Sequence, residues 1–97
     1  MFKHDLKSHN FYLNSNNVPE YRLHYHLIKN NQVMAIDHIF VSPEVKSDLV
    51  DELIRFALSY ARDNHLKVMP LGPTILAYFK ENQAALTDLF YKPSLIL

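Results

Sequence analysis

Cysteine and tryptophan are absent from the 97-residue chain, and glycine occurs only once. Without cysteine the chain can form no disulfide, no thiolate metal site and no cysteine nucleophile. With one glycine it has no glycine-rich loop of the kind that surrounds a phosphate with bare backbone N–H groups. The lack of cysteine is compatible with the cytoplasm, the location that we expect.

An excess of charge of one sign is also absent, because ten Lys and Arg residues balance ten Asp and Glu residues. The basic residues are scattered, so no field or patch favours nucleic acid or an anionic membrane. No apolar run approaches the roughly 20 residues of a membrane span, and the first ten residues contain no apolar signal segment. We therefore expect no nucleic acid and no membrane as partners.

Hydrophobic residues make up 48% of the chain, enough for the core of one compact domain over residues 1–97. The first half has the periodicity of strands. A turn-forming "NSNN" after Phe11–Asn14 predicts a first hairpin, and the alternation of residues 21–27 predicts a strand with one buried face. The nearly continuous apolar run Val33–Val41 is typical of a central strand covered on both faces.

Helical spacing begins after Ser42. The first helix can start at Pro43 or, after a tight turn, near Asp48, and it should end around "DNH". "LKVMPL" predicts a short buried strand and "PTILAYFKENQAALTDLF" a second helix, followed by an apolar tail, "YKPSLIL". The order predicts a mixed α/β sheet, mainly antiparallel, with one parallel crossover.

Three segments of the chain, "AIDHIFVSPEV", "ALSYARDNHLKVMPLGP" and "AYFKENQAALTDLF", carry a family resemblance. They resemble the short, stand-alone branch of the GNAT N-acetyltransferase superfamily, which has "I-x-H-T-x-V-x-P-E-L-R-G-Q-G-I-G", then "A-L-x-Y-A-R-x-x-x-L-K-V-x-P-L-C-P" and "A-Y". The positions in register in the second and third segments are Tyr60, Ala61, Arg62, Leu66, Lys67, Val68, Pro70, Leu71, Pro73, Ala77 and Tyr78. The resemblance covers about residues 35–90.

The resemblance implies a GNAT-like fold that transfers acetyl from acetyl-CoA to an amine acceptor, a small molecule or a peptide. In that family the strand before the main helix splays from its neighbour, and acetyl-CoA lies there. The residues that the resemblance assigns to the cofactor are Ile39, Phe40, Val41, Val45, Lys46, Ser47, Asp48, Leu49, Val50 and Gly72. The family's histidine falls on His38, and Tyr78 is the candidate acid.

The cofactor loop departs from the family pattern, because "K-S-D-L-V-D-E-L" replaces "R-G-Q-G-I-G-S-A-L" and contains none of its three glycines. Side chains at Asp48 and Leu49 would crowd a diphosphate, and the Asp48 carboxylate would compete with it for the helix N–H groups. Helix capping by Ser47 and Asp48 is the alternative role of this stretch.

Gly72 replaces the cysteine that is common at its position in the short branch. Acyl transfer through a thiol is thereby excluded, which leaves direct attack by an amine with His38 as base and Tyr78 as proton donor. The alternatives are a strand histidine hydrogen-bonded across the sheet and a tyrosine packed in the core. His24 and His26, two apart on one strand face, suit a metal site, but the sequence places no third ligand near them.

Two functions follow from these observations. One is a small N-acetyltransferase whose loop binds acetyl-CoA without glycines. The other is a degenerate GNAT fold without catalysis, acting as a structural or partner-binding module and dimerising through the tail or a sheet edge.

Overall fold

The structure, a computed structural model, describes residues 2–91, and of Ser47 only the backbone. Its elements are β1 Lys3–Asp5, β2 Asn10–Ser15, β3 Val18–Ile28, β4 Val33–Val41, η1 Ser47–Leu49, α1 Val50–Asp63, β5 Lys67–Pro70, α2 Pro73–Glu81 and α3 Gln83–Leu86. None of the helices described is long and apolar enough to cross a membrane. The second of the two starts expected for the first helix is the one observed, since a 3₁₀ turn precedes α1.

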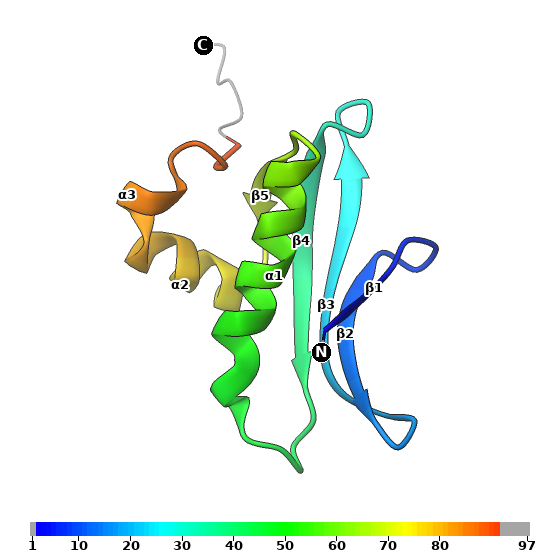
Figure 1. The fold of residues 1–97 in the computed structure, drawn as a ribbon. Helices are drawn as coiled ribbons and strands as arrows, with labels where there is room; N and C mark the ends of the chain where they lie inside the picture. Colours follow the sequence, from blue (N-terminus) through cyan, green and yellow to red (C-terminus); the bar gives the residue numbers. More distant parts are fainter. Residues whose placement is uncertain (1, 92–97) are drawn as a thin grey trace.

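The strands form one sheet in the order β1-β2-β3-β4-β5. Neighbours pair antiparallel from β1 to β4, whereas β4 and β5 are parallel. Parallel neighbours need a crossover, and α1 provides it by running along one face of the sheet, with α2 and α3 near the β5 edge (Figure 1). The predicted fold class, a mixed and mainly antiparallel sheet with helices, is confirmed.

Asparagine-rich turns set the register of the antiparallel strands. Asn16 and Asn17, with φ of 51° and 64°, connect β2 to β3 in a two-residue hairpin turn. Lys29, Asn30 and Asn31 also have positive φ and connect β3 to β4. Asparagine tolerates this left-handed region better than most residues, which explains how a chain with one glycine makes these turns.

One face of α1 and one face of β3 meet in the core. Residues at three- and four-residue spacing on α1 are buried, namely Leu53, Ile54, Ala57, Leu58 and Ala61. They pack with the buried β3 residues Tyr21, Leu23 and Tyr25. Full burial of one such leucine or isoleucine contributes roughly 1.5–3 kcal/mol relative to exposure. Both periodicity-based predictions for these faces are confirmed.

Four features differ from expectation. The predicted second helix is divided into α2 and α3 at Asn82, whose side chain donates to the carbonyl of Tyr78 at 2.8 Å and so ends α2. β4 is covered on both faces only over residues 33–36, because the helices do not cover the outer face further on. β1 had no sequence prediction. Phe90, at the end of the predicted second helix, forms a parallel bridge to Val68 instead, and of the tail only Tyr91 belongs to the described residues, where its N–H donates to the Val68 carbonyl at 2.8 Å.

The side chain of His4 attaches β1 to the rest of the sheet. Its ring stacks on Phe11 at 4.0 Å between centroids, and its Nε2 is hydrogen-bonded to the Tyr25 hydroxyl at 2.6 Å. Burial and the nearby His9 lower the pKa of His4, and Asp5 offsets this in part. His4 therefore favours its neutral form in the folded protein.

The free energy of unfolding should decrease as the pH is lowered, partly because of His4. Below about pH 6.5, His4 takes up a proton in the unfolded chain before it does so in the folded one, so the free energy of unfolding decreases. We expect His4→Gln to show a smaller loss of melting temperature between pH 7.5 and pH 5.5 than the parent. The control His65→Asn, at an exposed position with φ of 57°, should keep the parent's pH dependence. An unchanged slope in His4→Gln would contradict the assignment.

Candidate functional site

The site begins where β4 and β5 stop pairing. Their parallel register runs from Val33 opposite Lys67 to Ile36 opposite Pro70, and the last backbone bond is from the Leu71 N–H to the Ile36 carbonyl at 2.9 Å. Beyond it, residues 37–41 of β4 pair with β3 alone among the described strands. The resemblance implies such a splayed strand, and the structure has it.

Gly72, the chain's one glycine, lies against β4 at this point. A Cβ built on it would be 3.1 Å from the backbone oxygen of Asp37, closer than nine in ten real Cβ contacts, so the backbone would have to shift by a few tenths of an ångström. Its φ of −86° is ordinary, so the requirement for glycine is one of space and not of backbone conformation. The start of α2 therefore packs closer to β4 than a side chain at this position would allow.

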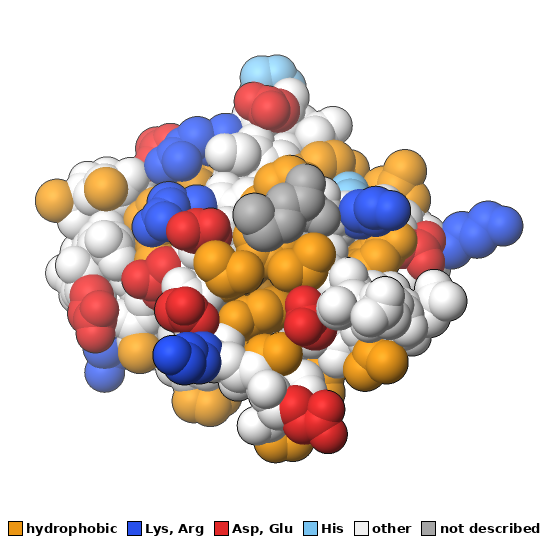
Figure 2. Space-filling model, turned by 60° about the horizontal axis from the view of Figure 1, so that its bottom comes forward, with side chains coloured by type: hydrophobic (Ala, Val, Ile, Leu, Met, Phe, Trp, Pro, Cys, Tyr) orange, Lys and Arg blue, Asp and Glu red, His pale blue; other side chains and the backbone are white. Residues whose placement is uncertain are grey.

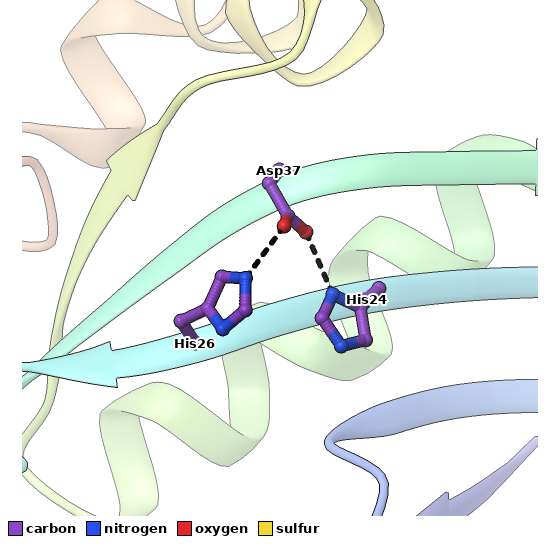
Figure 3. A group of neighbouring side chains, drawn as sticks. All are labelled: His24, His26 and Asp37. Carbon is purple, nitrogen blue, oxygen red and sulfur yellow. Dashed lines mark hydrogen bonds and ion pairs between the residues drawn. The ribbon is translucent and has the colours of Figure 1, made fainter.

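β4 carries one extra residue next to this point. Tyr25 is opposite Ile36, but His24 is opposite His38, so Asp37 is an additional residue in a β-bulge. A bulge re-aims side chains, and here it turns the carboxylate of Asp37 toward two rings of β3. His24 Nδ1 lies 2.9 Å from Asp37 Oδ1, and His26 Nε2 lies 2.9 Å from Asp37 Oδ2 (Figure 3).

The carboxyl group of Asp37 stays ionised in this arrangement. Partial burial alone would raise its pKa, but the hydrogen bond from His24 and the charges of His24 and His26 outweigh it and lower the pKa. The result is an anionic group held between two imidazoles on the face of the sheet opposite to α1, which lies behind the strands in Figure 3.

His38 and Tyr78, the predicted catalytic pair, are not brought together by any hydrogen bond among the described residues. His38 is exposed and, as the cross-strand partner of His24, lies on the same sheet face as His24. It is His24, and not His38, that is hydrogen-bonded across the sheet. Tyr78 on α2 is half-buried and packs against the core, which agrees with the packing alternative.

The residues assigned to the cofactor divide between core and surface. Ile39 and Val41 pack against the core, whereas Phe40 points to the outer face and is 37% exposed. In the loop the residues that pack against the core are Val45, Leu49 and Val50. Lys46 and Asp48 are exposed, and the carbonyl of Lys46 accepts a hydrogen bond from the Tyr21 hydroxyl.

The start of α1 has no side-chain cap at its N-cap residue, Leu49, and no capping hydrogen bond from Asp48 is present among the described residues. The side chain of Ser47, the other predicted cap, lies outside the described residues. Acidic side chains lie around the start of α1 instead. Asp51 and Glu52 are in the first turn of α1, and Glu44 is exposed in the loop before it. Figure 2, which turns this end of the molecule toward the viewer, shows carboxylate and basic side chains around an apolar centre.

A groove of about 610 Å³ lies elsewhere, between α2, α3 and the last described residues. Its lining residues are Pro70, Leu76, Phe79, Lys80, Gln83, Leu86, Thr87 and Phe90. None of them is a predicted site residue, and Lys80 is the one charged group in this lining. The groove is apolar and offers little acid–base chemistry.

Asp37 is the site residue that the sequence analysis missed. The signal was present in the β3–β4 turn, because pairing Ile28 with Val33 and counting outward places Asp37 opposite His24. Counting in register therefore finds the third group beside His24 and His26, although it does not find the bulge.

The family model described as GCN5-related N-acetyl-transferase matches residues 10–89. The chain belongs to the GCN5-related N-acetyltransferase family. The GNAT match extends the resemblance to β2 and β3, which the motifs alone did not cover.

Among solved structures, this GNAT chain is similar to the NMR solution structure of a GCN5-like protein from Staphylococcus aureus. The TM-score is 0.68 at 21% sequence identity, over 97% of this chain and 90% of that one. At this identity the likeness shows the fold. A comparison with curated proteins finds no match.

The close approach of Gly72 predicts that the family's cysteine no longer fits here. Gly72→Cys and Gly72→Ala add the same Cβ near the Asp37 carbonyl, so each should lower the free energy of unfolding by about 1–3 kcal/mol in urea denaturation followed by circular dichroism. The two losses should be similar, because the shared Cβ and not the thiol causes them. Full stability of Gly72→Ala would contradict the close approach.

Proposed function

We propose that the protein is an N-acetyltransferase that transfers acetyl from acetyl-CoA to the amine of a small molecule or peptide. The observation that carries this proposal is the parting of β4 from β5 at Asp37. On that side, residues 37–41, which include the exposed His38, have no partner strand among the described residues. Membership of the GNAT family supports the same chemistry.

The residues present fit one part of acetyl-CoA and not another. The edge of β4 at Ile39–Val41 offers backbone N–H and C=O groups to the amides of a pantetheine arm, much as an edge strand binds an extended peptide. The loop does not fit the diphosphate, because it lacks glycine and its exposed acids outnumber the one amine of Lys46. We infer that the pantetheine arm, and not the diphosphate, provides most of the affinity.

The chain's own groups can then move two protons. When bound, acetyl-CoA supplies an acetyl group activated as a thioester. The imidazole of His38 accepts the proton that the acceptor's ammonium group must lose before its nitrogen can attack the carbonyl carbon. The Tyr78 hydroxyl would donate a proton to the thiolate that leaves when the amine nitrogen takes the acetyl group from the thioester.

His38→Ala should reduce turnover about 10²- to 10⁴-fold, the usual contribution of a general base. The assay is thiol release from acetyl-CoA with polyamines, amino acids and lysine peptides as acceptors. Tyr78→Phe keeps the ring that packs on the core and removes only the hydroxyl, so a reduced rate would assign the proton donor. His65→Asn is the matched control, since it replaces an exposed histidine away from β4 and should leave the rate unchanged.

Parent turnover that His38→Ala leaves intact would remove His38 from the mechanism. Absence of turnover with every acceptor, together with absence of acetyl-CoA binding, would overturn the enzyme proposal as a whole.

One observation favours a second candidate, a GNAT fold that serves as a structural or partner-binding module without catalysis. Glu44, Asp48, Asp51 and Glu52 are all exposed around the start of α1, where the family binds a diphosphate. Carboxylates there interact favourably with the helix dipole and repel a second anion. In a protein that does not bind acetyl-CoA, these carboxylates stabilise the helix and repel no ligand.

The two candidates differ in what happens when Asp48 is replaced. If the site is only weakened, Asp48→Gly should tighten acetyl-CoA binding in isothermal titration, because it removes a side chain and a repelling charge. Asp48→Asn removes the charge alone and should have a smaller effect. No heat from the parent or either variant at millimolar acetyl-CoA would favour the non-catalytic module.

A further inference from the structure

A polar cluster of His24, His26 and Asp37 lies on the outer face of the sheet, and what we infer from it does not depend on the acetyltransferase proposal. His24 and His26 extend from β3, and Asp37 extends toward both from the bulge of β4 (Figure 3). Their side chains are 31%, 58% and 30% exposed, so the cluster is open to solvent on one side. One nitrogen of each imidazole lies 2.9 Å from an oxygen of the same carboxylate.

The spacing of these atoms suits a metal ion. One ligand atom from each residue can be chosen so that all three lie within 4.8 Å of one another. Bonds of about 2.0–2.1 Å in a tetrahedral zinc site place ligand atoms roughly 3.3 Å apart. The two observed nitrogen–oxygen distances of 2.9 Å are somewhat shorter than that value, and all three ligand atoms lie within 4.8 Å of one another, so an ion would enter by rotation of these side chains.

The backbone holds the three groups in place without an ion. Residues two apart on a strand point to the same face, which aligns His24 with His26. The bulge then supplies Asp37, whose backbone oxygen is in turn close to Gly72. On a sheet face that only contacts water, polar side chains point into solvent separately. Here both histidine rings point at the Asp37 carboxylate.

The chemistry of the ligand set indicates the kind of ion. Two imidazoles and one carboxylate suit borderline divalent ions such as Zn²⁺ and Co²⁺, whereas Mg²⁺ and Ca²⁺ prefer oxygen ligands only. Three protein ligands with a solvent-facing side leave a fourth position for water or a further ligand, as in open zinc sites.

We propose that His24, His26 and Asp37 form a binding site for one divalent transition-metal ion, with Zn²⁺ as the expected type and one coordination position open to solvent. The ion replaces the two hydrogen bonds between the carboxylate and the rings. Because the ligands come from β3 and from the bulge of β4, the complete site exists only in the folded sheet.

The test is titration of untagged protein with Zn²⁺ in a calorimeter and with Co²⁺ by visible absorption, both without acetyl-CoA. We expect one ion per chain and no comparable binding of Mg²⁺. His26→Ala and Asp37→Asn each remove a ligand and should weaken binding by about 100-fold or more, since loss of an outer partner alone costs 10- to 100-fold. The control His65→Asn should bind like the parent.

Two further measurements separate loss of ligation from loss of folding. Circular dichroism should show that His26→Ala, at the most exposed ligand, keeps the parent's fold. Zn²⁺ should raise the melting temperature of the parent and of His65→Asn but not of His26→Ala, because the ion binds the folded state. Absence of 1:1 binding at millimolar ion, or binding that survives both ligand replacements, would overturn the site.

Discussion

One extra residue in β4 decides where the polar groups of the site lie. Without the bulge at Asp37, the pairing of Tyr25 with Ile36 would continue and place Asp37 opposite His24. With it, His38 takes that position, and the carboxylate is free to reach both rings of β3. Bulges locally disrupt a ladder and re-aim side chains, and this one also marks the end of β4–β5 pairing.

The chain uses its one glycine at the same point. Gly72 allows α2 to begin directly against the backbone of Asp37, and its dihedral angles are available to any residue. The close approach thus links the free edge of β4, the bulge and the first turn of α2. The positive φ that glycine often supplies in tight turns is adopted here by four asparagines and by His9, Lys29 and His65, and the single glycine serves close packing instead.

The start of α1 shows two electrostatic effects that oppose each other. Asp51 and Glu52 in its first turn, with Asp48 just before it, each favour the helix by about 0.3–1 kcal/mol through the helix dipole. The same charges disfavour a diphosphate at the same place. Family membership assigns the fold, and within that fold this local charge opposes the binding of a diphosphate.

The sequence by itself determined the elements that depend on periodicity and turn chemistry. Alternation predicted the buried face of β3, three- and four-residue spacing predicted the buried face of α1, and the asparagine clusters predicted the hairpin turn at Asn16 and Asn17. These are local properties, set by neighbours a few residues away. The motifs also predicted the family, and in the structure they fall on β4, α1, β5, α2 and α3.

Only the tertiary structure decided the break at Asn82, the presence of β1 and the bulge that lets Asp37 reach both His24 and His26. The break depends on a side chain that satisfies the Tyr78 carbonyl, and β1 depends on the packing of His4 between residues of three other elements, Phe11, Tyr25 and Tyr60. The polar cluster depends on cross-strand register. A shift of one residue exchanges the two faces of a strand, so no pattern within a single strand can specify which side chains meet across a sheet.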